Sequence, residues 1–347
     1  MLLDPSDWSL AYRVEELLRR LHGSLAERLS PETHSSAVEI QTGPQATVEA
    51  AMHELRELRG ELSAQLEPLG LRAAVAGVHP FAVWHDVEVT DEQRYRDVYG
   101  SMRELARREP TFALHIHVAI PSAEIAVRVL DRMRAHLPLL LALSANSPFW
   151  QGRDTGLASV RTPLFQAFPR VGIPRPFLDY ADYVEAIDLL VRCDAIPDPS
   201  FLWWDVRLQP RFGTIEVRIM DAQTDLAHSA ALVALVQSLV RVDADAPPAP
   251  ERPRYRREVL DENRFLAARD GMEAQLLDAD AGLRRPAREL LGETLELCRP
   301  AAATLGCLAA LESVRMLSEN PGAAHQRAVA QAGDKLTGLV QTLAREF

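Results

Sequence analysis

The 347-residue sequence is 47% hydrophobic and 25% charged, which is typical of a soluble globular protein rather than a disordered or fibrous one. Its 49 acidic residues outnumber its 38 Lys and Arg residues, and the formal net charge is -11. This balance argues against an extended basic surface that would bind nucleic acid or an anionic membrane. It is compatible with a local basic pocket.

The start of the chain, MLLDPSDWSLAYRVEELL, is acidic where a secretory signal peptide is basic and then continuously apolar. No later apolar run reaches the length that spans a bilayer. The 3 cysteines lack CxxC spacing, so they indicate neither a disulfide framework nor a zinc knot. Together these features predict a soluble, cytoplasmic protein with no membrane or nucleic-acid partner.

Helical and extended segments alternate through the first two thirds of the chain. Apolar residues at helical spacing predict amphipathic helices at 46–69, 91–108, 123–145, 180–192 and 226–242. Pro138 predicts a break in the third of these, or the first turn of another helix. Alternation of apolar and polar residues predicts strands at 36–41, 71–80, 112–121, 201–209 and 213–221. The last two strands are joined by a short turn and form a predicted hairpin.

Strands separated by helices, with one hairpin, predict an α+β fold in which helices pack on one face of a sheet. Residues 1–243 form the predicted sheet-plus-helix body. The Pro-rich, charged stretch 244–259 is a predicted linker. Residues 260–347 have mostly helical spacing, and we expect them to pack on the same domain.

The stretch FALHIHVAIP at 112–121 has two rows of side chains, because successive residues of a strand point to opposite faces. Phe112, Leu114 and Ile116 belong to an apolar row, which we expect to be buried in the hydrophobic core. The other row carries His115 and His117 between small residues. A polar row of this kind marks either a solvated face or a site.

Three other predicted strands have the same division into an apolar and a charged side. Their charged sides bring the polar set to seven residues: Glu39, His115, His117, Asp205, Arg207, Glu216 and Arg218. An antiparallel sheet often has one solvated face, and such a face needs no function. The residues of a solvated face are usually a mixture of Lys, Ser, Thr and Glu. A face made almost entirely of acids, imidazoles and guanidiniums therefore favours ion binding.

Carboxylates and an imidazole on one face suit Mg²⁺ or Mn²⁺, which take oxygen ligands and tolerate a nitrogen. Arginines beside them supply planar, permanently charged donors for phosphate or carboxylate. The combination predicts a phosphorylated ligand. A long loop within 137–177 adds Arg161 and several Ser, Asn and Gly residues, and loops of this length in compact domains are usually functional.

Several of these stretches resemble the type-2 glutamate–cysteine ligases, which are also called carboxylate–amine ligases. The resemblance is carried by HIHVAIP, by LPLLLALSANSPFWQGRDTGLASVRTPLFQAFPRVGIP and by GTIEVRIMD. VEIQTGP, GVHPFA and ENRFLAARDGMEAQLLD fit the same family, so the similarity covers almost the whole chain. The run from Asn146 to Arg161 is the most specific part.

The resemblance implies a curved, mainly antiparallel sheet with helices on its convex face, as in the glutamine synthetase and guanido kinase group. It implies an ATP-dependent ligase that phosphorylates an amino-acid carboxylate and then forms an amide with an amine. By position, the metal ligands would be Glu39, His115 and Glu216, and Arg161 and Arg218 would be catalytic. Both arginines and His117 would contact substrate or nucleotide. Mg²⁺ is the expected metal, with Mn²⁺ as an alternative, and a homodimer is compatible with the family.

Members of this family normally open with a strand of the type GVEEEFLLVDP, whose glutamates join the metal site, whereas this sequence begins at MLLDP. We therefore expect either that the sequence starts late or that the metal site is incomplete. In the second case the chain would bind nucleotide or amino acid with impaired turnover or none. A third hypothesis, a metal hydrolase built on His115 and His117, gives Arg161 and Arg218 no role.

Overall fold

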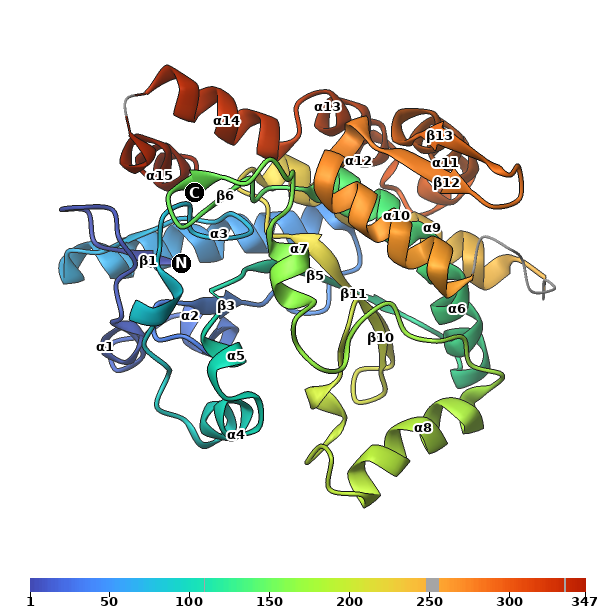
Figure 1. Ribbon diagram of the computed structural model, residues 1–347, viewed down its shortest axis with the longest axis horizontal. Helices are drawn as coiled ribbons and strands as arrows, with labels where there is room; N and C mark the ends of the chain where they lie inside the picture. The colour runs from blue at the N-terminus through green and yellow to red at the C-terminus, as the bar shows by residue number, and fades with distance from the viewer. Residues whose placement is uncertain (109, 248–255, 334) are drawn as a thin grey trace.

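A three-stranded antiparallel sheet lies at the centre of the molecule, as the ribbon of the computed structural model shows (Figure 1). The structure describes residues 1–108, 110–247, 256–333 and 335–347. The strand order of the central sheet is β10-β11-β5, and the other described strands form two-stranded pairs. Of these pairs β8-β9 is parallel and the rest are antiparallel, so the fold is mixed α+β with mainly antiparallel pairing.

Strands β5 and β11 of the central sheet are the longest in the described part of the chain. The strand bounds are β1 Leu2–Leu3, β2 Leu29–Pro31, β3 Val38–Ile40, β4 Arg72–Ala73, β5 Ala113–Ala119, β6 Phe149–Trp150, β7 Arg153–Asp154, β8 Val171–Gly172, β9 Trp203–Trp204, β10 Val206–Gln209, β11 Thr214–Asp221, β12 Gln275–Asp278 and β13 Leu283–Pro286. The β10–β11 hairpin confirms the predicted pairing of these two segments.

Helices make up most of the remaining chain. Their bounds are α1 Val14–Leu18, α2 Leu25–Arg28, α3 Val48–Leu66, α4 Gln93–Met102, α5 Glu104–Arg107, α6 Ala123–Ser144, α7 Arg161–Phe165, α8 Tyr180–Arg192, α9 Leu226–Asp245, α10 Arg257–Asp270, α11 Ala287–Thr304, α12 Leu308–Glu312, α13 Val314–Glu319, α14 Gly322–Ala332 and α15 Leu336–Arg345. Thr47 and Ser122 cap α3 and α6, because each side chain accepts a hydrogen bond from a backbone N–H of the first turn.

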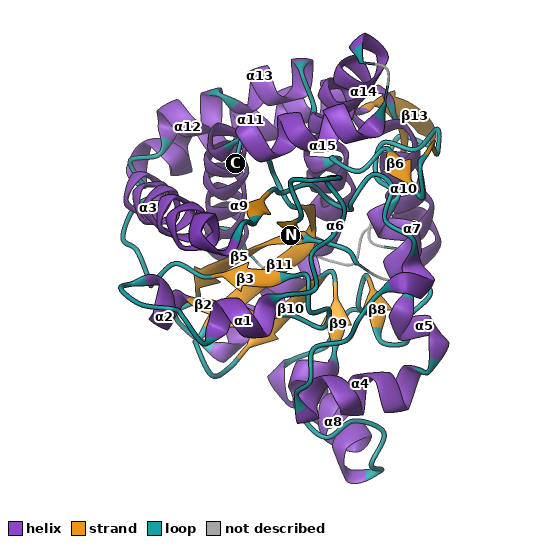
Figure 2. Cartoon of the chain, turned by 90° about the vertical axis from the view of Figure 1, so that its left-hand side faces the viewer, coloured by secondary structure: helices purple, strands orange, loops and turns teal. Residues whose placement is uncertain are grey.

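The apolar face of the sheet packs against α6 and α9. Figure 2 shows α3, α6 and α9 together on one side of β5 and β11. Ile215, Val217 and Ile219 of β11 are at most 1% exposed, and Ile116 of β5 joins them in the same core. Burial of this row leaves the alternate residues, which carry the charges, on the opposite face.

One helix in the described residues, α9, is long and apolar enough to cross a membrane by length and composition. Its apolar stretch is 56% buried inside the protein, and α9 packs against α3, α6 and α11. A core helix of a soluble protein has the same character.

Several elements differ from the sequence-based expectation. The helix α6 continues through Pro138, because residues 137–144 are buried and their packing offsets the helix bond that Pro removes, roughly 3 kcal/mol. The predicted strand at 71–80 contributes β4 alone. Arg103, with φ of 56°, separates α4 from α5.

Beyond residue 260 the portion that was expected to be mostly helical also contains a β-hairpin, β12–β13. The helices α10 and α11 pack against α6 and α9 of the body. Within the predicted linker 244–259, α9 extends to Asp245 and α10 begins at Arg257. Residues 248–255 of that linker lie outside the described residues.

Candidate active site

A cavity of about 1490 Å³ extends along the central sheet and includes its polar face. Small-molecule sites typically measure roughly 300–1,000 Å³, so this cavity has room for more than one substrate. Strands β2, β3, β5, β10 and β11 contribute to its walls, together with α3 and α4. Ionisable residues gather on the polar wall, among them Glu32, Glu39, His115, His117, Arg207, Glu216 and Arg218, and the predicted site residue Arg161 also lines the cavity.

The register of the sheet places three of these side chains in one row. Arg207 of β10 is the direct partner of Glu216 in β11, and Glu216 is the direct partner of His117 in β5. Directly paired residues project from the same face of a sheet, so the alternation in the sequence is sufficient to bring them together. Asp205, expected on this face, is absent from the described residues that line the cavity, and its carboxylate pairs instead with Arg264 of α10 at 2.6 Å.

Glu216 is the most enclosed acid of the wall, with 2% of the residue exposed. Its Oε2 accepts a hydrogen bond from Arg207 Nε at 2.6 Å, and its Oε1 accepts one from Arg218 Nη1. Burial acts to raise the pKa of Glu216, but Arg218 and Arg207 outweigh it and hold that pKa well below its ordinary value. The carboxylate is therefore ionised at all physiological pH values.

Both histidines face the same acid. His115 Nδ1 lies 3.8 Å from Glu216 Oε1 and 3.9 Å from Glu39 Oε1, while Arg218 Nη1 is 3.3 Å away. Burial and the neighbouring Arg218 lower the pKa of His115 well below its ordinary value, so the imidazole is neutral. Burial also lowers the pKa of His117, whose Nδ1 lies 3.0 Å from the Thr214 hydroxyl.

Glu32 is a site residue that the sequence pattern did not reveal. It follows β2 directly, and the β2–β3 hairpin carries Glu39 on the other strand. Burial raises the pKa of Glu32 to about 7, and the negative charge of Glu39 adds to this effect. A buried acid beside a second carboxylate in one cavity forms a place where a cation is favourable. The available signal was an acid directly after the strand that pairs with β3, but β2 has only three residues and ends in Pro31, so its sequence shows no clear alternation.

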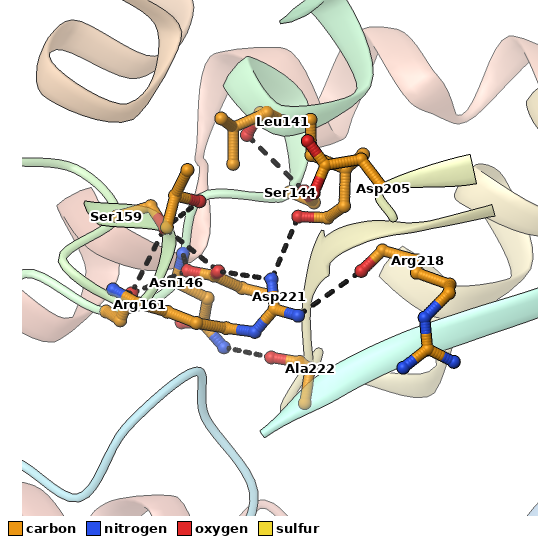
Figure 3. A network of polar contacts seen from close by, with 12 residues as sticks. Leu141, Ser144, Asn146, Ser159, Arg161, Asp205, Arg218, Asp221 and Ala222 are labelled. Atoms are coloured by element: carbon orange, nitrogen blue, oxygen red, sulfur yellow. Dashed lines mark hydrogen bonds and ion pairs between the residues drawn. The ribbon is translucent and has the colours of Figure 1, made fainter. Parts of the chain in front are cut away.

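Arg161 lies at the start of α7, and its guanidinium binds backbone rather than an acid of the cavity wall. Nη2 donates to the carbonyl of Arg218 at 3.2 Å and Nη1 donates to the carbonyl of Ile219 at 2.9 Å. Figure 3 shows Arg161 reaching the Arg218 carbonyl while the side chain of Arg218 points away from it. Arg161 Nη1 also lies 3.7 Å from the buried carboxylate of Asp221.

The loop that carries Arg161 is tied to the C-terminal helices. Asn146 donates its side-chain amide to Ala222 O, and its backbone N–H donates to Asp221 Oδ2 at 2.8 Å. Gln326 of α14 donates to the carbonyl and to the side-chain oxygen of Asn146 at 2.8 and 2.7 Å. This network joins α14, the loop and β11 into one buried unit.

The donor set of the wall suits a hard or borderline divalent cation that is shared with a ligand. Among the described residues no three His, Cys, Asp or Glu side chains converge in a preformed metal site. Mg²⁺ is commonly held by one or two carboxylates together with substrate phosphates, so a full protein cage is not required. Glu32 and Glu39, with the neutral His115, fit that description better than Glu216, whose carboxylate is already held by two arginines.

Comparison with known proteins identifies the family. The model of glutamate–cysteine ligase family 2 (GCS2) matches residues 2–346. A protein from Rubrobacter xylanophilus named "Putative glutamate--cysteine ligase 2-1" is 42% identical over 96% of this chain and 89% of its own length. The chain belongs to glutamate–cysteine ligase family 2. A protein of similar name from Sorangium cellulosum is 40% identical over 89% of this chain and 83% of its own length.

Solved structures share the fold at lower sequence identity. Glutamate–cysteine ligase from Francisella tularensis, in complex with AMP, superposes with a TM-score of 0.71 at 13% identity, covering 99% of this chain and 86% of that chain. A bifunctional glutathione synthetase from Pasteurella multocida gives a TM-score of 0.65 at 13% identity, with 99% of this chain and 50% of that chain covered. The family model and the sequence relatives confirm the resemblance to the GCS2 family, and the solved structures show a shared fold.

Proposed function

We propose that this GCS2 family chain is an ATP-dependent carboxylate–amine ligase of the glutamate–cysteine ligase type. The observation that carries the proposal is the meeting of an acid pair, a neutral imidazole and two arginines on one wall of a cavity large enough for nucleotide and amino acid. A carboxylate at neutral pH is a poor electrophile, and phosphorylation by ATP gives it a leaving group. The wall supplies both the cation ligands and the anion ligands that this step needs.

Arg218 is the residue that we assign to the transferred phosphoryl group. Its Nε is buried and has no hydrogen-bond partner among the residues that the structure describes. Nη1 is occupied by Glu216, which fixes the orientation of the guanidinium. An anionic oxygen at Nε would satisfy the buried donor and gain a charge-assisted hydrogen bond. His117, farther along β5, lines the same wall and is assigned to substrate contact.

Glu32, Glu39 and His115 are the residues that would hold Mg²⁺, or Mn²⁺ in its place. The bound cation would offset the charge of the terminal phosphates during transfer. Sequence position favoured Glu216 as a third metal ligand, but a cation there would have to displace Arg207 or Arg218. We therefore assign Glu216 to holding the two arginines.

The proposed reaction has two steps. An oxygen of the acceptor carboxylate forms a bond to the γ-phosphorus of ATP, and the bond from that phosphorus to ADP breaks. The amine nitrogen then attacks the acyl carbon, the bond to the phosphate breaks, and the amine proton leaves with the departing phosphate. Glutamate and an amine such as cysteine are the small-molecule partners that the family type suggests.

We further infer that the central sheet is curved with its polar face concave and helices on its convex face, as in the glutamine synthetase and guanido kinase group. Residues 1–243 and 260–347 would act as one catalytic domain, which is supported by the packing of α10 and α11 against α6 and α9. The cytoplasm is the proposed location, because Cys193, Cys298 and Cys307 are all free. A homodimer is compatible with this proposal and is tested by light scattering.

The test is amine-dependent release of ADP and phosphate. Purified protein receives ATP, Mg²⁺, glutamate and a panel of amines that includes cysteine, and the amide product is identified by mass. We expect turnover that needs all components and that falls strongly in the Arg218→Ala variant. Arg175→Ala is the matched control, because this exposed arginine pairs with Asp182 away from the cavity wall. Nucleotide binding without amine-dependent release would favour a noncatalytic binding protein instead.

A further inference from the structure

The strand β11 contains a bulge at the site itself. Val217 pairs with Ile116 and Met220 pairs with Leu114, so two residues of β11, Arg218 and Ile219, oppose the single residue His115 of β5. A bulge leaves its extra residue outside the regular ladder and changes the direction of the side chains beside it. The direction in which Arg218 enters the cavity therefore depends on how the bulge is held.

The backbone groups of the bulge are held from outside the β5 ladder. The N–H of Arg218 donates to the carbonyl of Asp205 at 2.8 Å. The carbonyls of Arg218 and Ile219 both accept from the guanidinium of Arg161, at 3.2 and 2.9 Å. A planar guanidinium can serve two successive carbonyls with two of its donors, which an ammonium group cannot match in fixed geometry.

Arg161 is itself fixed by a buried carboxylate. Asp221 is fully buried, and its oxygens accept hydrogen bonds from the Ser147 hydroxyl at 2.6 Å and the Ser159 hydroxyl at 2.9 Å. The backbone N–H of Arg161 donates to the same Ser147 hydroxyl at 3.2 Å. Asp221 also ends β11, so the anchor of Arg161 belongs to the strand that Arg161 braces (Figure 3).

We propose that Arg161 is a positioning residue for the ligase reaction, acting on the β11 bulge and through it on Arg218. Arg161 contributes by fixing where the Arg218 guanidinium points rather than by binding phosphate or the acceptor carboxylate. This rests on the proposed function, in which Arg218 contacts the transferred phosphoryl group. It reassigns Arg161 from the ligand-contacting role that sequence position suggested.

A double-mutant cycle separates positioning from direct contact. We measure amine-dependent phosphate release for the native chain, Arg161→Ala, Arg218→Ala and the double variant. Removal of Arg218 should lower kcat by about 10²–10³-fold, as for a lost transition-state donor. Arg161→Ala should lower kcat by roughly 10-fold or more with little change in KM, and the double variant should match Arg218→Ala within about threefold.

The proposal would be overturned if the kcat of the double variant fell by the product of the two single-variant losses. It would also be overturned if Arg161→Ala raised the KM for ATP or glutamate strongly and left kcat unchanged. Arg161→Lys provides the conservative comparison, and we expect partial recovery of kcat because the charge beside Asp221 is kept while the two-carbonyl fork is lost. Arg175→Ala, at an exposed position after β8, should be additive with Arg218→Ala in every measurement.

Failure of the proposed function is recognised separately. If the native chain shows no amine-dependent turnover, the same cycle is measured as MgATP affinity by calorimetry. Non-additive changes in the binding free energy of the two single variants would then support the positioning role, and additive changes would refute it. Circular dichroism and thermal unfolding establish that each variant is folded. If Arg161→Ala does not fold, Arg161→Gln and Arg161→Lys replace it in the cycle, since both retain side-chain donors, and the same two outcomes apply.

Discussion

The acid pair of Glu32 and Glu39 gives a direct test of the proposed cation site. In the metal-free protein the pKa of Glu32 is raised to about 7 from its ordinary value of 4.5, chiefly by burial and then by Glu39. Folded protein thus binds this proton more tightly than unfolded protein does. The resulting stabilisation is complete below pH 4.5 and is lost as the pH rises through 7.

The size of the effect follows from the pKa difference. At ~1.4 kcal/mol per pH unit, a change from 4.5 to about 7 corresponds to about 3 kcal/mol of unfolding free energy. Glu32→Gln removes the titration and keeps the shape of the protonated acid. The variant should match the native chain at low pH and exceed it by about 3 kcal/mol at pH 8 in the absence of metal.

Urea unfolding in chelator, followed by circular dichroism from pH 4 to pH 8, measures the difference between the two proteins. Addition of Mg²⁺ at pH 8 should raise the stability of the native chain and leave Glu32→Gln almost unchanged, because a bound ligand stabilises the state that binds it. Glu27→Gln, at an exposed position of α2, should reproduce the native profile. A constant difference between native and Glu32→Gln across this pH range would refute the reasoning.

Three further predictions concern the same site and its supports. Glu39→Gln should raise the Mg²⁺ concentration needed for half-maximal turnover by more than about 10-fold, the lower limit seen even for outer-shell changes, and chelator should abolish turnover in the native chain. Gly77→Ala should lower the unfolding free energy by about 1–3 kcal/mol, since its Cβ would lie 2.7 Å from Asp221 Oδ2, whereas Gly60→Ala in the open middle of α3 should raise it by roughly 0.5–1 kcal/mol. Gln326→Ala should cost about 1–3 kcal/mol by leaving the buried Asn146 side-chain oxygen without the Gln326 donor, while the Gly77 N–H still donates to the Asn146 carbonyl. Gln331→Ala, exposed on the same helix, should stay within about 0.5 kcal/mol of the native chain, and equal losses for the two glutamines would contradict the network.

The central sheet could be predicted because apolar and polar residues alternate along most of its strands. The apolar row of β5 and the row of Ile215, Val217 and Ile219 in β11 specify one buried face, and the charges must then share the other. Segments without such alternation were less predictable. Pro138 predicted a break that packing overrides, and β12–β13 lies in a stretch whose spacing suggested a helix.

The candidate site could be predicted where residues follow the period of the strand. His115, His117, Glu216 and Arg218 are brought together as expected, and Glu39 reaches them from β3. The contribution of Glu32 depends on a three-residue strand with too few positions to show a period. The backbone contacts of Arg161 depend on a bulge, and the pattern of side chains in the sequence does not predict that bulge.

The most direct test of the proposed chemistry follows an oxygen atom from substrate to phosphate. Glutamate labelled with ¹⁸O in its γ-carboxylate is incubated with the protein, ATP, Mg²⁺ and cysteine, and the released phosphate is analysed by mass. Acyl-phosphate formation predicts that each phosphate carries one ¹⁸O atom from the carboxylate. Phosphate released at the same rate without the label would show that water, not the carboxylate, attacks ATP, and would contradict the proposed reaction.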